Sequence, residues 1–412
     1  MGPNGQRADD AASRPRLFRA ETRRGTAGFY HLAQSDDGPW WLLDPAGNPA
    51  WCKAVHGVRA AGGQGDTALP QDSAARLTTW GFNAVGVSGD ATGREDGLPF
   101  LATVDFCGPG PTLLGPGLRL PDVFDPQWPA RAQARAQEVC GALTDEPQLI
   151  GWVTDDLPGW AQPGMEPRPS LLQQCLSLEP AFAAYHAAWE FTLALHGGKL
   201  DAMARAWGMT LPNREVVRGL TRAEIGIATR GYGRDNARWS REVARRYFTV
   251  TSAAIRAADP RHLVLGCRFG GRAGDAVLSE CAYPTIDLPM PDWREIAPAV
   301  PGAPLNPVLA GDVCWAEDEF WRAPPGDAGA ARRLTSVERM LRRGRLALDR
   351  AARHPAIVGY VWRQWQDEPG EQPPFARGLV HLNDAAAREH TELLTAFNLR
   401  AESVRRAAAP RR

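Results

Sequence analysis

The feature that most constrains the fold of this 412-residue chain is a repeated alternation of short apolar segments with helical patterns. Buried strands are apolar runs of about four to eight residues, whereas amphipathic helices repeat about every 3.6 residues. Strands that alternate with helices form parallel sheets. Eight segments fit the strand pattern: the one that ends at residue 58, and 82–87, 100–106, 149–153, 262–269, 286–290, 307–312 and 357–365. Eight such strands predict an α/β fold, the (β/α)8 TIM barrel.

Helical patterns lie between most of these strands, at residues 73–80, 126–143, 237–258 and 330–353. The longest interruption, residues 157–238, contains two more helical patterns, at 181–195 and 200–207. We therefore expect a helical insertion after strand four that packs over the active face. Residues 108–120 are rich in Gly and Pro and are expected to form a long loop at the barrel mouth.

One domain accounts for most of the chain. Residues 1–26 contain few apolar residues and are expected to form a disordered tail. Residues 27–400 are expected to form the (β/α)8 domain, followed by a basic, frayed tail at residues 401–412. The sequence contains no fixed-period repeat.

Composition excludes several classes of function. The chain has 47 Lys and Arg against 47 Asp and Glu, and the basic residues are spread along it, which argues against nucleic acid or an anionic membrane as the partner. No stretch approaches about 18 uninterrupted apolar residues, so no transmembrane helix is expected. The N-terminus is rich in Arg and lacks the apolar core of a signal peptide, so we expect a cytoplasmic protein.

Metal chemistry is not indicated. The seven Cys residues are scattered singly, without Cys-x-x-Cys spacing, which fits a reducing compartment. Most of the eight His residues fall outside the predicted strand ends, where a metal-dependent barrel hydrolase would gather its ligands. We therefore predict neither a metal nor a cofactor.

The strongest chemical candidates are acids at the ends of predicted strands four and seven. Strand 149–153 runs into Asp155 and Asp156, and strand 307–312 ends at Asp312. Active sites of (β/α)8 barrels lie at the carboxyl ends of the strands. Adjacent carboxylates disfavour each other's ionisation, so we interpret Asp156 as a general acid/base. An Asp-rich helix cap is the alternative. Three acids beyond strand seven could replace Asp312, or else form a solvated loop: Glu317, Asp318 and Glu319.

Other polar and aromatic side chains lie at the remaining strand ends. His56 follows strand one beside Lys53, and a packed structural His is the alternative. Arg268 ends strand five, where it could orient a carboxylate, bind an acidic sugar, or form a structural ion pair. Four candidates for binding substrate follow strand eight: Trp362, Gln364, Trp365 and Asp367. We expect one of these two Trp rings to stack on a sugar and the other to lie in the core, because alternate strand positions face opposite ways.

Several separated segments carry a family likeness through their order and spacing: Asp-Val-Phe-Asp-Pro at 122–126, Asp-Glu-Pro-Gln-Leu-Ile-Gly-Trp at 145–152, Leu-Asp-Ala-Met-Ala-Arg-Ala-Trp-Gly at 200–208, Arg-Tyr-Phe at 246–248 with 254–269, and 354–367. Together they resemble the agarase-like glycoside hydrolases, within the superfamily of (β/α)8 retaining glycosidases. The likeness spans roughly residues 29–398.

The resemblance implies that an acid/base ends strand four and a nucleophile ends strand seven. In the superfamily both are Glu, and Asn precedes the acid/base. Here Asp155 and Asp156 stand in place of Asn-Glu, and Asp312 stands in place of the nucleophile. Asp155 is then expected at the 2-hydroxyl of the sugar, where a carboxylate can only accept a hydrogen bond unless protonated. Its charge would raise the pKa of Asp156, as a general acid requires.

The implied function is a glycoside hydrolase that cleaves a β-linked, galactose-type oligosaccharide or polysaccharide. Retaining enzymes hold their carboxyl groups about 5–5.5 Å apart, and inverting enzymes about 6.5–9.5 Å. Asp is one methylene shorter than Glu, so each carboxylate should be drawn back by about 1.5 Å. Three outcomes remain open: retention with shifted loops, inversion with water in the wider gap, or a catalytically inactive carbohydrate-binding homologue.

Overall fold

The computed structural model describes most of the chain. The described residues are 18–58, 71–87, 97–108, 110–115, 118–156, 169–269, 277, 285–300, 303–316, 337–371 and 375–408, without the side chains of residues 71, 72 and 156. Among these, no helix is both long enough and apolar enough to cross a membrane.

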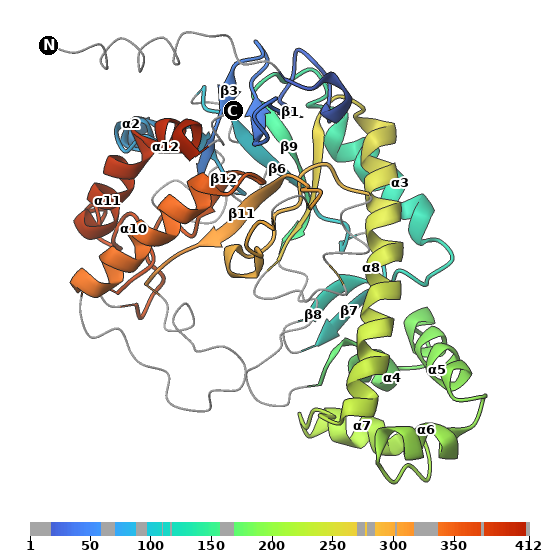
Figure 1. The fold of residues 1–412 in the computed structure, drawn as a ribbon. Coiled ribbons are helices and arrows are strands. Elements are labelled where there is room, and N and C mark those ends of the chain that lie inside the picture. Colours follow the sequence, from blue (N-terminus) through green and yellow to red (C-terminus); the bar gives the residue numbers. More distant parts are fainter. Residues whose placement is uncertain are drawn as a thin grey trace, which may run out of the picture.

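The centre of the molecule is a sheet of seven parallel strands in the order β10-β9-β6-β5-β4-β12-β11 (Figure 1). Its strands are β4 (Cys52–Val55), β5 (Ala84–Val85), β6 (Phe100–Val104), β9 (Leu149–Asp156), β10 (Leu263–Arg268), β11 (Val308–Val313) and β12 (Ile357–Trp362). They correspond to predicted strands one to five, seven and eight. The predicted parallel architecture is therefore confirmed as a nearly closed, TIM-like barrel of seven strands.

The predicted sixth strand lies in the gap between β10 and β11 but is not a regular strand. Within residues 286–290, the Asp287 N–H donates to the Val264 carbonyl oxygen of β10 at 2.8 Å. On the other side, the Leu309 N–H of β11 donates to the Pro289 carbonyl oxygen at 3.0 Å. The proline lacks an N–H and so cannot complete a ladder. The segment thus bridges the two edge strands with an irregular hydrogen-bond pattern.

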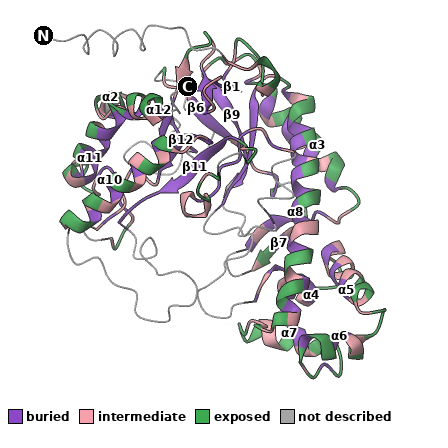
Figure 2. Ribbon diagram, viewed as in Figure 1, coloured by how far each residue is buried: buried purple, intermediate pink, exposed green. Residues whose placement is uncertain are grey.

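Two apolar layers account for the burial of the strands. Alternate strand residues such as Ala54, Leu101 and Leu265 belong to one buried cluster, together with residues from the other strands. The intervening residues, such as Val55 and Ala102, belong to a larger cluster that includes the helices. Because alternate side chains face opposite sides of a strand, the first cluster fills the barrel and the second joins the barrel to its helices. Figure 2 shows the strands buried and the helices buried along one side.

Helices surround the barrel. They include α2 (Gln71–Thr79), α3 (Trp128–Cys140), α8 (Arg230–Ala258), α10 (Val337–Arg353), α11 (Arg388–Asn398) and α12 (Ala401–Ala408). Between β9 and α8 lie four shorter helices: α4 (Leu171–Ser177), α5 (Ala183–Leu195), α6 (Leu200–Trp207) and α7 (Glu215–Arg222). Figure 1 shows these four gathered at the N-terminal end of the long α8.

Helix α8 begins seven residues earlier than the predicted 237–258. Thr229 caps it by accepting a hydrogen bond from the Tyr232 N–H at 3.3 Å. A Cβ at Gly231 would lie 1.9 Å from the carbonyl oxygen of Ala206, so this glycine permits close contact with α6. Tertiary packing therefore extends the helix through a Gly-containing segment that local propensity does not favour.

The expected loop at residues 108–120 is partly regular. Strands β7 (Thr112–Gly115) and β8 (Leu118–Pro121) pair as an antiparallel hairpin. A second small antiparallel sheet contains β1 (His31–Gln34), β2 (Trp40–Leu43) and β3 (Pro49–Ala50). This sheet includes the strand and turn expected before the first barrel strand.

Parts of both expected tails, residues 18–26 and 401–408, have a described structure. Within residues 18–26, the backbone of Arg24 pairs with Leu32, and its guanidinium donates to the Asp287 carbonyl oxygen at 3.1 Å. Residues 401–408 form α12, in which Arg405 is only 1% exposed. Its guanidinium donates to the carbonyl oxygen of His354 at 2.9 Å and to that of Trp40. The long-range hydrogen bonds of Arg24 and Arg405 thus tie two polar segments of the sequence to the barrel domain.

Candidate active site

Three predicted site residues meet at the carboxyl ends of three strands. Arg268 at the end of β10 donates from Nη1 to Oδ1 of Asp312 on β11 at 3.0 Å. His56, just after β4, places Nε2 3.8 Å from the same oxygen. The side chains of Arg268 and Asp312 are 11% and 4% exposed, so this is a nearly buried ion pair. The other carboxylate oxygen of Asp312, Oδ2, is buried and has no hydrogen-bond partner within the part of the chain that the structure describes.

The orientation of the His56 ring is fixed by the backbone around it. The Val87 N–H donates to Nδ1 at 3.0 Å. In the neutral ring this leaves the proton on Nε2, the atom that faces Asp312. The backbone of His56 is held against the carboxyl end of β12, because its N–H donates to the Trp362 carbonyl oxygen and its own carbonyl oxygen accepts from the Trp365 N–H. His56 thus presents an N–H donor to the mouth of the barrel.

The strand ends that carry the candidate acids have unusual backbones. Among the described residues, four that are not glycine have positive φ, and two of them are Asp155, at 43°, and Asp312, at 50°. The left-handed region costs an L-residue about 1–2 kcal/mol. Such strain persists only where surrounding contacts enforce it, and it clusters at functional sites. Both strand ends that we selected for their acids are therefore held in strained conformations.

Asp156 is placed by its backbone. It ends β9 and pairs in the parallel register with Arg268 of β10, the residue whose guanidinium binds Asp312. Arg268 therefore lies beside the backbone of Asp156 in the sheet and binds the carboxylate of Asp312 through its guanidinium. The side chain of Asp156 lies outside the described residues, as do Glu317, Asp318 and Glu319. The separation of the two carboxyl groups stays a prediction.

Asp155 does not face the barrel mouth. It is fully buried, and its Oδ1 accepts hydrogen bonds from the N–H groups of Phe106 at 2.8 Å and Cys107 at 3.1 Å. Its Oδ2 accepts from the Tyr247 hydroxyl at 2.6 Å. Burial, and next a hydrogen bond with Asp105, raise the pKa of Asp155 to about 7. Because these internal contacts occupy both oxygens, the structure gives no support to the expected contact with a sugar hydroxyl, which stays a prediction.

The two candidate Trp residues of strand eight are covered by protein. Trp362 is fully buried, with its ring centroid 4.4 Å from that of Trp315. Trp365 is 4% exposed and packs against Trp80 with a centroid separation of 5.9 Å. Neither ring offers an open face in this structure. Sugar stacking on one of them stays a prediction, and packing is the role that the contacts show.

The other two candidates after β12 hold the local loop together. Asp367 accepts from the Gly378 N–H at 2.8 Å, and its second oxygen lies 2.7 Å from Nδ1 of His381. Gln364 donates from Nε2 to the Gln366 carbonyl oxygen at 2.9 Å. Their contacts are internal, so their binding role also stays a prediction.

Sequence reasoning missed the partners that surround Asp155. Asp105 is the second-last residue of the third predicted strand, 100–106, and this position near a strand end is a signal that could have selected it. Tyr247 lies in the middle of a helix, where nothing in its local pattern points to a strand end. Lys53 was expected at the barrel mouth but instead donates to Glu402 of α12 at 2.7 Å.

One group of side chains has the composition of a metal site. Single ligand atoms of Asp105, Cys107 and Asp155 lie within 4.8 Å of one another. However, both oxygens of Asp155 already accept hydrogen bonds, and burial raises the pKa of the Cys107 thiol well above its usual range. A divalent cation requires deprotonated ligands with free lone pairs, so this group does not fit one.

Comparisons with known proteins identify the fold. No protein-family model matches the chain, and no curated protein matches its sequence. Among solved structures, PfGH50B matches with a TM-score of 0.65 and 17% identity, over 96% of this chain and 68% of its own. An exo-beta-agarase matches with a TM-score of 0.65 and 18% identity, over 95% and 66%. The agarase AgWH50C matches with a TM-score of 0.64 and 16% identity, over 97% and 70%.

These matches define the class of fold to which the chain belongs. The chain has the barrel fold of agarase-like glycoside hydrolases and spans about two thirds of the length of the matched structures. The resemblance inferred from the separated segments is therefore confirmed at the level of fold. At identities of 16–18% the sequences themselves share little.

Proposed function

We propose that this protein is a glycoside hydrolase that uses Asp156 and Asp312 as its carboxylate pair. The observation that carries the proposal is the environment of Asp312. Arg268 binds one carboxylate oxygen and balances its charge, while the other oxygen is buried without a hydrogen-bond partner among the described residues. A buried acceptor left unsatisfied is costly in a folded protein. A substrate atom or a water activated by the carboxylate would satisfy it.

The positions of the other groups support a reaction at a glycosidic bond. Asp156 leaves β9 beside Arg268, so it can serve as the acid that protonates the leaving oxygen. The Nε2–H of His56 can donate to a sugar hydroxyl or to Asp312 itself.

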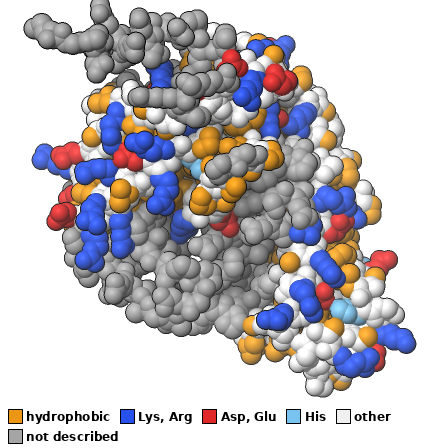
Figure 3. Space-filling model, in the orientation of Figure 1, with side chains coloured by type: hydrophobic (Ala, Val, Ile, Leu, Met, Phe, Trp, Pro, Cys, Tyr) orange, Lys and Arg blue, Asp and Glu red, His pale blue; other side chains and the backbone are white. Residues whose placement is uncertain are grey.

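The proposed substrate is a β-linked, galactose-type oligosaccharide or polysaccharide. Support comes from the shared fold with structures described as an exo-beta-agarase and an agarase. We interpret α4–α7 as an insertion beside the active face, because Figure 1 shows them on the side toward which β9 runs. The visible face in Figure 3 has many Lys and Arg side chains with fewer acidic ones between them, but the whole chain balances 47 basic residues with 47 acidic ones. This distribution is consistent with an uncharged partner rather than a polyanion.

Inversion is the proposed stereochemical course. The chain has Asp at both positions where the superfamily has Glu. With the backbones in place, the shorter side chains widen the gap by up to about 3 Å, which moves a retaining separation of about 5–5.5 Å into the inverting range. Asp312 would then act as the base that activates a water, and Asp156 as the acid.

The experiment is turnover of aryl β-galactosides and agar-derived oligosaccharides by the wild type, Asp312→Asn and Asp156→Asn. We expect each variant to lose about a hundredfold or more in kcat while still binding oligosaccharide in calorimetry. Asp201→Asn is the matched control, because Asp201 forms an exposed pair with Arg205 on α6. Oligosaccharide binding without turnover by the wild type would instead identify a carbohydrate-binding homologue.

A further inference from the structure

A second carboxyl pair lies behind the proposed site. A carboxyl oxygen of Asp155 on β9 and one of Asp105, which follows β6, lie within 4.8 Å of each other. Two carboxyl groups this close repel each other when both are charged, and they can share a hydrogen bond only if one of them carries a proton, because carboxylates have no donor. The Cys107 N–H donates to both, at 2.9 Å to Asp105 and 3.1 Å to Asp155. A common backbone donor therefore holds the two carboxyl groups side by side.

The surroundings decide which carboxyl holds the proton. Asp105 is partly exposed and accepts from Arg119 of β8 at 2.7 Å. Although burial opposes this, the hydrogen bond from Arg119 lowers the pKa of Asp105. Asp155 is fully buried, and the described groups that donate to it, two N–H groups and the Tyr247 hydroxyl, are all uncharged. These surroundings favour the charge on Asp105 and the proton on Asp155.

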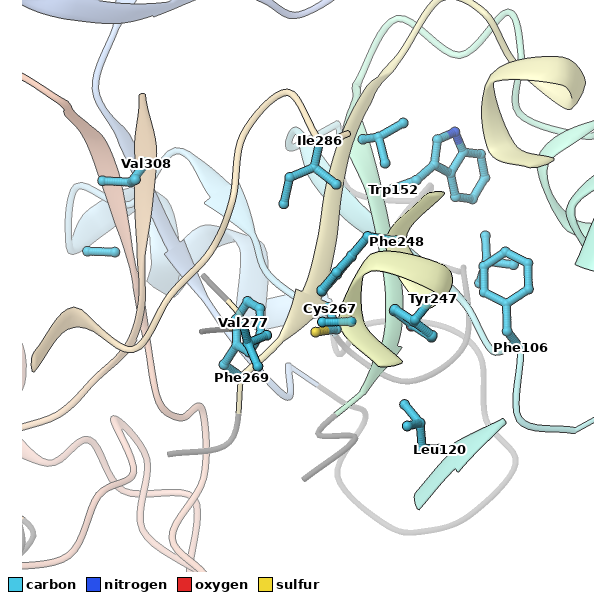
Figure 4. Packing of buried hydrophobic residues seen from close by; sticks show 14 of the residues in the cluster. Phe106, Leu120, Trp152, Tyr247, Phe248, Cys267, Phe269, Val277, Ile286 and Val308 are labelled. Atoms are coloured by element: carbon cyan, nitrogen blue, oxygen red, sulfur yellow. The ribbon is translucent and has the colours of Figure 1, made fainter. Parts of the chain in front are cut away.

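Asp155 also connects three parts of the fold. It joins the turn after β6, through Phe106 and Cys107, to Tyr247 of α8. Figure 4 shows Tyr247 projecting from α8 beside Cys267 of β10. Tyr247 also reaches the Thr154 hydroxyl at 2.9 Å, so it contacts two consecutive residues at the end of β9.

We propose that Asp155 is a positioning residue which, by sharing one proton with Asp105, holds the left-handed turn from which Asp156 leaves β9. The backbone at Asp155 has φ 43°, a conformation that needs enforcement by side-chain contacts. If these contacts are lost, β9 relaxes toward ordinary extended geometry and Asp156 changes direction. The consequence for Asp156 rests on the proposed function, whereas the shared proton does not.

The test compares Asp155→Asn with the wild type in urea unfolding from pH 5 to pH 8. Asn has the shape of a protonated Asp, can accept from both N–H groups and can donate to Asp105. A carboxyl whose folded pKa lies above its unfolded value stabilises the fold at low pH and loses that contribution as the pH rises through the folded value. With values of about 7 folded and about 3.9 unfolded, the folding equilibrium constant of the wild type should fall roughly 100-fold relative to Asp155→Asn across this range.

A second variant and a control sharpen the result. Asp105→Asn offers an amide donor to Asp155 and so should flatten the pH dependence. Asp201→Asn, on the surface of α6, should keep the wild-type curve. Parallel curves for the wild type and Asp155→Asn would overturn the proposal, whether or not the protein turns over any glycoside.

Kinetics test the positioning role separately. We expect Asp155→Ala to lower kcat with little change in KM, and Asp155→Asn to restore most of kcat. If kcat falls equally in Asp155→Ala and Asp155→Asn, the hydrogen bonds that Asn can keep do not position Asp156, and the positioning role is contradicted. A wild type without turnover, combined with the predicted pH curves, would reject the hydrolase while leaving the shared proton established.

Discussion

Replacing Arg268 by Met should strongly destabilise the protein, because the substitution leaves Asp312 as a buried charge without compensation. The two groups are 3.0 Å apart, and their side chains are 11% and 4% exposed, so solvent screens the pair only weakly. Removing one partner of such a buried pair costs about 3–5 kcal/mol, whereas removing both can be nearly neutral. We therefore expect Arg268→Met to lower the free energy of unfolding by about 3 kcal/mol or more.

A double-mutant cycle isolates the pair from other contacts of the arginine. Asp312→Asn removes the carboxylate charge, so Arg268→Met should cost much less in that background. The coupling energy from urea unfolding of the four proteins should be about 2–3 kcal/mol. If the losses of unfolding free energy in the two single variants add up to that of the double variant within about 0.5 kcal/mol, Arg268 and Asp312 are not a coupled buried pair. The assay needs no substrate and so tests the site independently of its proposed reaction.

Two further predictions concern the reaction course and the C-terminal helix. Proton NMR of the first product should show an inverted anomer, and a retained anomer would show that the loops have moved to compensate for the shorter acids. Arg405→Met should lower the unfolding free energy by about 3 kcal/mol in urea titration, because buried carbonyl oxygens of His354 and Trp40 lose a charged donor. Arg406→Met is its matched exposed control and should change stability by less than about 0.5 kcal/mol.

Much of the barrel could be predicted from the sequence because its strands are apolar on both faces. The predicted strand 357–365 contains β12, and 262–269 contains β10, since burial on both sides leaves a continuous apolar run. The segment at 286–290 has the same composition, but a proline interrupts its hydrogen bonds. Arg405 lies in a polar segment, yet its guanidinium binds the carbonyl oxygens of His354 and Trp40, which are far from it in the sequence. Local composition does not predict such long-range contacts.

The sequence predicts which residues lie at the strand ends, but not the direction in which each side chain points. His56, Arg268 and Asp312 were selected because each ends a strand, and parallel topology brings such ends together. Asp155 was selected by the same rule, yet its side chain turns to Phe106 and Tyr247 inside the fold. Asp312 has a left-handed backbone too, so the difference comes from the buried donors around Asp155, which alternation along a strand does not predict.

The most direct test of the proposed hydrolase is a crystal structure of the Asp312→Asn variant with a bound agar-derived oligosaccharide. The proposal predicts that one glycosidic bond of the sugar lies between the side chains of residues 156 and 312. The carboxyl carbon of residue 156 and the amide carbon of residue 312 should be about 6.5–9.5 Å apart, with a water molecule next to residue 312. A sugar bound elsewhere, or the two side chains on different sides of the molecule, would contradict it.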